Sequence, residues 1–346
     1  MIREPNKFKA AHLFLAVSAV LLILLSLELG ARLVVRLTYG SKARKEIWEL
    51  SYQPYLLHLS KRSGRERWQD FVNQNQPPSE GQYRILVLGA STAEACPENT
   101  IKETFQPYVG QDVKVLNLAQ VGYIISQELI MLSLYGVNFH PDLVITLDGA
   151  NDIVNMTKTE RPEIHYQSNY IKYAVEHPVL NGLRSLFNRS QFVHSLIKIR
   201  ERRSERLSQH DEERFVKMTQ NYLQTIDTMA VLVTGYGAQY IHVLQPCLFS
   251  RKNTTERERA LAKMYEYRKQ FMVNAFQKLD ENLSRHRFPK SVYYVYATDA
   301  FNSTDKECFK DEVHLTENGY RILWDYIAEE ARKQGFRPVK AEGETE

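Results

Sequence analysis

Three short segments of this 346-residue chain carry polar side chains, either where an apolar run breaks off or near the carboxyl end. They are Gly89-Ala90-Ser91 after the run 84–88, Gly149-Ala150-Asn151-Asp152 after the run 143–147, and Asp311-Glu312-Val313-His314. Together they supply a hydroxyl, an amide donor, an imidazole and a carboxylate. An open parallel sheet holds its ligands at the carboxyl ends of its strands, so segments far apart in the sequence can converge on one pocket there.

A serine hydroxyl becomes a good nucleophile only when a neighbouring base takes its proton and a third group holds that base in one tautomer. Asp311 and His314 are three residues apart, so one turn can place the carboxylate on one imidazole nitrogen while the other nitrogen faces Ser91. Acyl transfer also needs donors for the oxygen that becomes negative. The candidates are the backbone N–H groups of Ser91 and Gly122 and the side-chain amide of Asn151. This set of residue types predicts nucleophilic catalysis by serine.

Each segment also has a simpler interpretation when it is taken alone. The first is compatible with a tight strand-to-helix turn, the second with a helix cap, and the third with a packed or surface histidine. Their joint order and their positions at strand ends favour the catalytic interpretation. Two other histidines fit a base less well, because His242 lies within an apolar run and His140 precedes Pro141, and neither has a carboxylate three residues on.

Five short runs rich in Val, Ile, Leu or Tyr predict the strands that would position these side chains. They are 84–88, 113–118, 142–147, 239–245 and 292–297. Helical patterns separate the runs, at 126–135, 215–233, 261–279 and 320–331. Strands that alternate with helices favour a parallel sheet with helices on both faces, which is an α/β fold.

The connection between the third and fourth runs, about 153–214, is much longer than a crossover needs. We interpret it as an insertion. It contains several aromatic residues and a charged stretch, 198–206. Two alternatives stay open: a lid or substrate-facing subdomain, or a helical insertion that packs its own small core and exposes its charges.

The amino terminus predicts a membrane anchor. Residues 10–27 form an apolar, helix-compatible run without the small-residue cleavage site of a secretory signal. We therefore expect residues 1–35 to be an uncleaved, single-span anchor; a long cleaved signal and a buried core helix are the alternatives. Basic residues flank the run on both sides, so the charges do not fix its orientation. Residues 36–82 read as a stalk or linker, 83–335 as the catalytic domain and 336–346 as a polar tail.

Composition excludes several other classes. The 45 basic and 41 acidic residues leave a net charge of only +4, which does not indicate a nucleic-acid partner. Glycine-rich nucleotide motifs are missing. Cys96, Cys247 and Cys308 are not in C-x-x-C spacing, so we expect neither a metal site nor a cofactor. Two alternatives stay open for Cys247 and Cys308: a disulfide bridge between them, or two free thiols.

Taken together, the four blocks Gly89-Ala90-Ser91, Gly122, Gly149-Ala150-Asn151-Asp152 and Asp311-Glu312-Val313-His314 resemble those of the SGNH (GDSL-type) hydrolase family, over residues 83 to 333. The resemblance implies a three-layer fold with a five-stranded parallel sheet. It also implies that Ser91 is the nucleophile, His314 the base, Asp311 its orienter, and Gly122, Asn151 and the Ser91 N–H the oxyanion donors. Ala90 departs from the usual Gly-Asp-Ser, but that aspartate is not the triad acid. The G-x-S-x-G turn of α/β-hydrolases fits worse, since its last glycine is missing here.

The expected activity is hydrolysis of an O-acyl ester, an O-acetyl ester above all, through an acyl-enzyme. Anchored relatives of this type imply an ester on a cell-surface polysaccharide, a catalytic domain on the exoplasmic or periplasmic side, and the lipid bilayer as a partner of the amino-terminal helix. Two alternatives remain. The same triad could pass the acyl group to a saccharide hydroxyl, as an O-acyltransferase does, or the chain could be an inactive, anchored assembly subunit.

Overall fold

The structure is a computed structural model that describes residues 7–39, 50–53, 55–60, 81–168, 190, 192 and 211–339. Its contacts divide the chain into two compact units, one of Met1–Trp48 with Asn169–Arg206 and one of Glu49–Ser168 with Leu207–Glu346. Parts of three predicted segments lie outside the described residues: much of the stalk, most of the insertion and the end of the tail.

Five parallel strands form the central sheet of the second unit, in the order β4-β3-β5-β6-β7. They are β3 (Gln82–Gly89), β4 (Asp112–Asn117), β5 (Leu143–Asp148), β6 (Gln239–Leu244) and β7 (Val292–Tyr296). All five predicted strands are confirmed. Because β3 lies between β4 and β5, the chain leaves it first to one side and later to the other. The carboxyl ends of β3 and β5 are therefore the switch point at which such sheets bind ligands.

Helices connect the strands of this unit. They are α3 (Ser91–Glu94), α4 (Glu98–Phe105), α5 (Ile125–Met131), α6 (Ala150–Met156), α10 (Asp211–Gly235), α11 (Glu256–Met264), α12 (Glu266–Arg285) and α13 (Glu317–Lys333). Short 3-10 or π segments are η2 (Gln106–Tyr108), η3 (Leu132–Gly136), η4 (Val137–Phe139), η5 (Leu248–Ser250) and η6 (Ala297–Asp299). The predicted stretches 126–135, 215–233 and 320–331 are helical. The predicted stretch 261–279 is not one helix, because α11 ends and α12 begins at Tyr265, whose φ of −110° and ψ of 15° interrupt the helical geometry.

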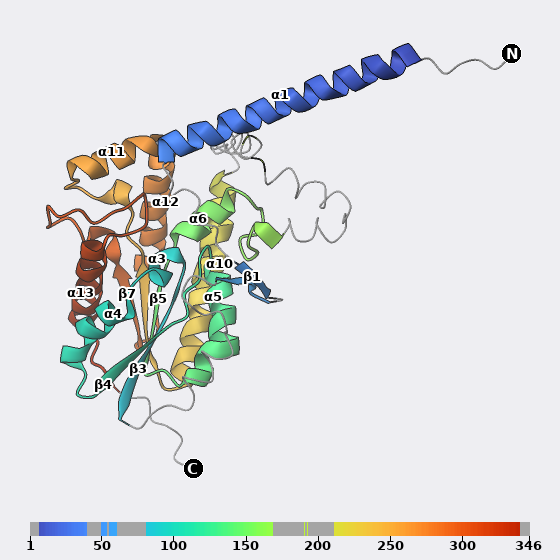
Figure 1. The fold of residues 1–346 in the computed structure, drawn as a ribbon. Coiled ribbons are helices and arrows are strands. Elements are labelled where there is room, and N and C mark those ends of the chain that lie inside the picture. Colours follow the sequence, from blue (N-terminus) through green and yellow to red (C-terminus); the bar gives the residue numbers. More distant parts are fainter. Residues whose placement is uncertain are drawn as a thin grey trace. The chain divides into compact units, whose positions relative to one another are not determined.

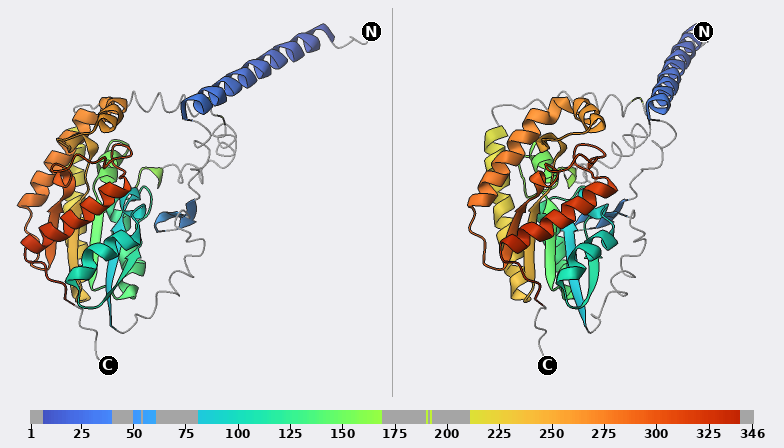
Figure 2. Two further views of the ribbon diagram at one scale, coloured as in Figure 1. Left: turned by 60° about the vertical axis from the view of Figure 1, so that its left-hand side comes forward. Right: turned by 90° about the vertical axis from the view of Figure 1, so that its left-hand side faces the viewer.

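The sheet is buried on both faces. Alternate side chains of a strand point to opposite sides, so Leu86 and Leu88 of β3 join one apolar cluster while Ile85 and Val87 join the other. The first cluster includes residues of α5, α10 and α12, and the second includes residues of α4 and α13. Figures 1 and 2 show α4 and α13 side by side on one face and α5 and α10 on the other. The predicted three-layer α/β fold is confirmed.

A two-stranded hairpin lies within the segment that the sequence predicts as a stalk. Strands β1 (Leu50–Gln53) and β2 (Leu57–Ser60) pair antiparallel. Leu56, His58 and Leu59 are at most 5% exposed, and both leucines belong to the core cluster on the α10 face of the sheet. This part of the segment therefore belongs to the packed second unit.

The first unit contains one long helix, α1 (Lys7–Tyr39). Its stretch Phe14–Val34 is 21 residues long and apolar enough to cross a membrane. Glu28 interrupts that stretch and pairs with Arg32 at 2.7 Å. Its other carboxylate oxygen accepts a hydrogen bond from the Ser190 hydroxyl at 2.7 Å, so a residue of the predicted insertion is attached to this helix.

Candidate active site

The turn that carries Ser91 depends on a glycine. β3 ends at Gly89, which has a φ of +145°, and a Cβ atom at this position would lie 2.5 Å from the carbonyl oxygen of Leu147 on β5. Only glycine fits so close to the neighbouring strand in this backbone conformation. The chain then turns directly into α3, and Ser91 is its first residue. The hydroxyl is thereby held at the switch point of the sheet.

The structure brings Ser91, His314 and Asp311 together. His314 Nε2 lies 2.8 Å from Ser91 Oγ, and His314 Nδ1 lies 2.7 Å from Asp311 Oδ2. The other oxygen of Asp311 accepts the backbone N–H groups of Val313 at 2.9 Å and His314 at 2.8 Å. Because a carboxylate only accepts, the imidazole carries its proton on Nδ1 and leaves Nε2 free to take the proton of the serine hydroxyl.

The charge of Asp311 is stabilised where it lies. Burial opposes its ionisation, but the hydrogen bond and charge of His314 and the two backbone N–H donors outweigh burial and lower the pKa of Asp311. The carboxylate is therefore ionised over the physiological range. Both side chains stay about one-third exposed, at 33% for His314 and 32% for Asp311, so both can be reached from solvent.

The loop that carries the base is fastened to the serine turn through Thr92. The Thr92 hydroxyl donates to the carbonyl oxygen of Val313 at 3.4 Å and accepts from Gln245 Nε2 at 3.3 Å. The Tyr320 hydroxyl of α13 donates to the Thr92 carbonyl at 2.9 Å. Residues from α3, from just after β6 and from α13 thus hold the loop of His314 against the serine turn.

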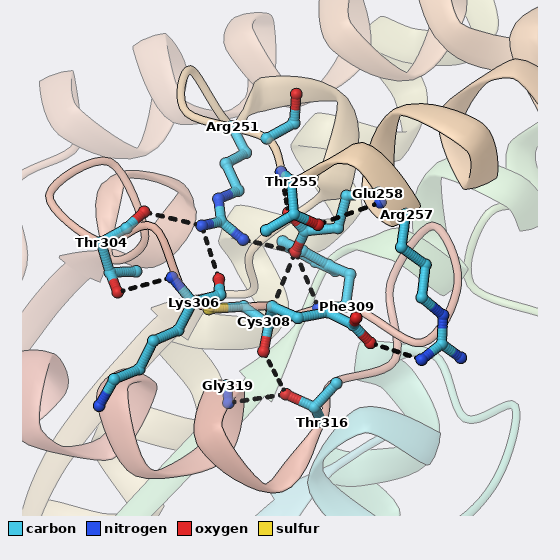
Figure 3. Close-up of polar contacts among 12 residues, drawn as sticks. Arg251, Thr255, Arg257, Glu258, Thr304, Lys306, Cys308, Phe309, Thr316 and Gly319 are labelled. Atoms are coloured by element: carbon cyan, nitrogen blue, oxygen red, sulfur yellow. Dashed lines mark hydrogen bonds and ion pairs between the residues drawn. The ribbon is translucent and has the colours of Figure 1, made fainter.

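A buried ion pair holds the segment that leads into this loop, and Figure 3 shows its bonds to that segment. Arg251 and Glu258 are both fully buried and bonded to each other. The Glu258 carboxylate also accepts the backbone N–H groups of Cys308 at 2.9 Å and Phe309 at 3.1 Å. Arg251 donates to two further carbonyls, those of Thr304 and Lys306, each at 2.8 Å. The segment that leads into Asp311 is therefore fixed by charge-assisted hydrogen bonds.

A second ion pair lies at the outer side of the loop. Arg268 of α12 donates to Glu312 at 2.5 Å, and each side chain is 14% exposed. The Glu312 carbonyl accepts the Leu248 N–H at 2.9 Å. The sequence did not indicate this pair or the Arg251–Glu258 pair, because neither arginine lies near the three segments in the sequence.

The three predicted oxyanion donors each have an N–H group that the hydrogen bonds of the structure leave available. The Ser91 N–H begins α3 and so has no partner within the helix. Gly122 has a φ of +77°, and no protein group in the described part of the chain bonds its N–H. The Asn151 amide donates one hydrogen to the Tyr123 carbonyl at 3.0 Å, which leaves its second hydrogen available. All three predicted donor residues lie just beyond adjacent strands of the sheet.

The other two histidines that the sequence offers lie elsewhere. His242 is fully buried in β6 with Nδ1 2.7 Å from the Thr146 hydroxyl, and burial lowers its pKa to about 3. His140 is exposed and has a φ of 46° in the turn after η4. Neither contacts Ser91. The preference for His314 as the base agrees with this geometry.

Three buried acids lie near one another on α5, β5 and α6, and only Asp152 belongs to one of the sequence blocks. Burial raises the pKa of Asp148 to about 6, and burial with the charge of Asp148 raises the pKa of both Glu128 and Asp152. Asp152 accepts the Ile125 N–H at 3.2 Å, and the Tyr222 hydroxyl donates to Asp148. These bonds tie α6 to the start of α5 and the end of β5 to α10, on either side of Asn151 in the sequence.

Cysteines and metal ligands complete the description of the site. All three cysteines are free and buried, so the alternative of a Cys247–Cys308 bridge does not hold in this structure. Across the described ranges, no group of three or more His, Cys, Asp or Glu side chains is arranged to hold a metal ion.

No family model and no curated protein matches the sequence. Solved structures do match. They include a lipase from a goat rumen metagenome (13% identity, TM-score 0.44, covering 73% of this chain and 98% of the other) and a GDSL-like lipase from Bacteroides thetaiotaomicron (13%, 0.41, 77% and 98%). A catalytic mutant of an acetylxylan esterase from Geobacillus stearothermophilus also matches (13%, 0.41, 75% and 97%). Likenesses this distant specify neither an activity nor a substrate for this chain, so its function has to be inferred from its own site.

Proposed function

We propose that this protein is a serine esterase of the SGNH type, with Ser91 as nucleophile, His314 as general base and Asp311 as the group that orients the base. The observation that carries the proposal is the continuous chain of hydrogen bonds from Ser91 Oγ through the imidazole to the Asp311 carboxylate, at 2.8 and 2.7 Å. Nucleophile, base and orienter within hydrogen-bond reach are the geometric signature of acyl transfer by serine.

The reaction follows from these positions. Ser91 Oγ attacks the ester carbonyl carbon as its proton moves to His314 Nε2, and Asp311 stabilises the imidazolium that forms. The tetrahedral intermediate then expels the alcohol, which takes the proton from His314. Water attacks the resulting acyl-serine with His314 again as base, and collapse of the second intermediate releases the acid and restores the hydroxyl.

The oxyanion of both intermediates would be held by the N–H groups of Ser91 and Gly122 and by the Asn151 amide. The three donors come from different segments but lie beyond β3, β4 and β5, which are neighbours in the sheet. Fixed donors of this kind act where charge develops and need no reorganisation during the reaction.

We further propose that the substrate is an O-acetyl or other short O-acyl ester on a carbohydrate at the cell surface, with α1 as a single-span anchor and the catalytic unit on the exoplasmic or periplasmic side. The support is the resemblance of the four sequence blocks, together with the 21-residue apolar stretch of α1. An acetylated oligosaccharide is therefore the first natural substrate to test.

The test is ester turnover by the full chain in detergent, with p-nitrophenyl acetate and then an acetylated oligosaccharide. Ser91→Ala should lower kcat by about 1,000-fold or more, because the members of a triad act as one unit. Ser133→Ala is the matched control, because this exposed hydroxyl bonds only a carbonyl of its own helical segment, that of Leu129. It should leave turnover unchanged.

Equal turnover in Ser91→Ala and the unmodified chain would refute the proposal. The same experiment identifies the acyl acceptor if released acetate and acetyl groups on a second, unacetylated oligosaccharide are both quantified. Release of acetate without transfer supports hydrolysis, whereas transfer to the second sugar would reassign the activity to an O-acyltransferase.

A further inference from the structure

Three hydrogen bonds attach the hairpin β1–β2 to the loop that carries Gly122 and to the first turn of α5, which follows that loop. His58 Nε2 lies 2.7 Å from the carbonyl oxygen of Val121. The Tyr123 hydroxyl donates to the His58 carbonyl at 2.6 Å, and the Gln127 amide donates to the Leu56 carbonyl at 2.7 Å. These bonds join residues 63 to 71 positions apart, and the His58 side chain is buried at 5% exposure.

The bond from His58 restrains the peptide unit that contains the donor. The carbonyl of Val121 and the N–H of Gly122 belong to the same planar trans peptide, in which the C=O and the N–H point in opposite directions. A carbonyl oxygen only accepts, so His58 carries its proton on Nε2 and donates it. Holding the Val121 oxygen on the hairpin side therefore directs the Gly122 N–H away from the hairpin.

Gly122 itself supplies little restraint. Glycine adopts positive φ values without steric cost, and a Cβ atom at this position would meet nothing within 4 Å. The Val121–Gly122 peptide could therefore flip unless hydrogen bonds hold it. A flipped peptide would place a carbonyl oxygen where the oxyanion develops, and the two negative oxygens would repel each other.

A second imidazole lies against the same loop. His165 is 7% exposed, and its ring centroid lies 6.4 Å from that of His58. Its Nδ1 accepts the Gln167 N–H at 3.2 Å, which places its own proton on Nε2. Burial lowers the pKa of His165 to about 4, with a further lowering by His58 and an opposing contribution from the Gly122 backbone. Two neutral imidazoles thus flank the peptide groups around Gly122.

We propose that His58 is a positioning residue for the oxyanion hole: its Nε2–H holds the Val121 carbonyl and so presents the Gly122 N–H to the developing negative charge. The inference rests on the proposed function. It assigns a catalytic contribution to a hairpin that precedes the sheet domain in the sequence and contains none of the four sequence blocks.

The test compares two substitutions of His58 in the full chain. His58→Leu fills similar space without a donor, whereas His58→Gln keeps an amide nitrogen that can reach the carbonyl. We expect His58→Leu to lower kcat by roughly 10- to 100-fold with little change in KM. This loss is smaller than the roughly 100- to 1,000-fold loss caused by removing one oxyanion donor, because the Gly122 N–H is misdirected only part of the time. His58→Gln should recover most of kcat.

The matched control is His286→Leu. This histidine also makes one hydrogen bond to a distant residue, Asp227, at 2.7 Å, but it lies just after α12, at the amino end of β7. The control should lose a similar amount of stability and keep its kcat. In hydrogen–deuterium exchange, the peptide that covers residues 118–124 should exchange faster in His58→Leu than in His286→Leu.

Two results would overturn the role of His58 but leave the proposed function intact. The first is an unchanged kcat in His58→Leu while turnover still depends on Ser91. The second is an equal loss of kcat in His58→Leu and His58→Gln. The second result would mean that packing, not the hydrogen bond, matters at this position. Turnover that does not depend on Ser91 would instead refute the proposed function and, with it, the role of His58. The failures of the two proposals are therefore distinguishable.

Discussion

The two loops that would carry the chemistry are held in different ways. In the base loop, residues 311–314, Asp311 bonds groups two and three residues further along the chain, including the imidazole that it orients. In the oxyanion loop, residues 118–124, the Val121 carbonyl and the Tyr123 hydroxyl bond His58, more than 60 residues earlier. Local bonds orient the imidazole of the base loop, although Thr92, Glu258 and Arg268 also hold that loop from outside, whereas the oxyanion loop depends on a distant hairpin.

This difference has a consequence for how each loop would fail. The base loop contains its own orienting carboxylate, so a substitution of Asp311 acts directly on the proposed base and costs only the bonds that Asp311 itself makes. The oxyanion loop would place a backbone N–H. Only proline lacks this group, and proline cannot adopt the φ of +77° at Gly122, so the loop is best altered through the groups that hold it. Variants in the two loops should therefore separate chemistry from positioning.

The largest effect is expected in the base loop. Asp311→Asn keeps the shape of the side chain but presents an amide to His314, which favours the wrong tautomer, so kcat should fall by about 10,000-fold, as it does when a triad aspartate is so replaced. Stability near neutral pH should also fall in this variant. The pKa of Asp311 is lower in the folded chain than in the unfolded chain, so the charged carboxylate stabilises the folded chain at pH values above the unfolded-state pKa. This contribution is lost as the pH falls through the folded-state pKa. Activity assays and urea titrations at pH 7 and pH 3 check both parts.

A folded Asp311→Asn variant with kcat near that of the unmodified chain would mean that the loop does not organise a catalytic base. The contrast between the two loops would then not hold for residues 311–314.

The buried ion pair Arg251–Glu258, which holds the segment leading into the base loop, should show the next largest effect, which is on stability. Glu258→Gln removes the charge paired with the fully buried Arg251, and breaking such a pair costs about 3 to 5 kcal/mol of unfolding free energy. Glu266→Gln is the control, since its pair with Lys269 is long, at 3.7 Å, and exposed. Urea unfolding of both variants measures the difference, and equal stabilities would show that the loop does not depend on this support.

Asn151→Ala tests the oxyanion side directly. Loss of one donor to the oxyanion should lower kcat by about 100- to 1,000-fold with a small change in KM. The exposed Asn282 of α12, whose amide bonds only the Lys278 carbonyl in its own helix, provides the control substitution to Ala. A rise in KM at constant kcat would place Asn151 in substrate binding and not in stabilisation of the transition state.

A histidine outside both loops should show the smallest effect, and only on the pH dependence of stability. His242 has a pKa of about 3 in the folded chain because it is buried. In the unfolded chain its pKa is about 6.5, so on acidification only the unfolded state gains a proton, and stability falls by about 2 to 3 kcal/mol between pH 6.5 and pH 4.5. His242→Asn should lack that part of the loss. Urea midpoints at the two pH values check it, and an identical pH dependence in both chains would contradict the assignment.

The sheet and the base loop could be predicted from the sequence because their signals are local. Five apolar runs marked the five strands, and the three-residue spacing of Asp311 and His314 marked a pair that the structure brings to 2.7 Å. The glycine at 89 marked the strand-to-helix turn, which its positive φ and the nearby Leu147 carbonyl require.

The supports of the site could not be predicted, because they depend on tertiary contacts. Arg251 and Glu258 look like ordinary charged residues of an exposed helix start, yet both are fully buried. The break at Tyr265 leaves the helical periodicity on either side intact. His58 lies in a segment whose polar composition indicates a linker, and its partner, Val121, has no polar side chain to mark it.

The most direct test of the central claim is the site of covalent labelling by a fluorophosphonate probe, read by mass spectrometry of the full chain after digestion. The account predicts one adduct, on Ser91, whose rate of formation falls by orders of magnitude in His314→Ala while the variant stays folded. An adduct on another serine, or equal labelling of Ser91 with and without His314, would contradict it.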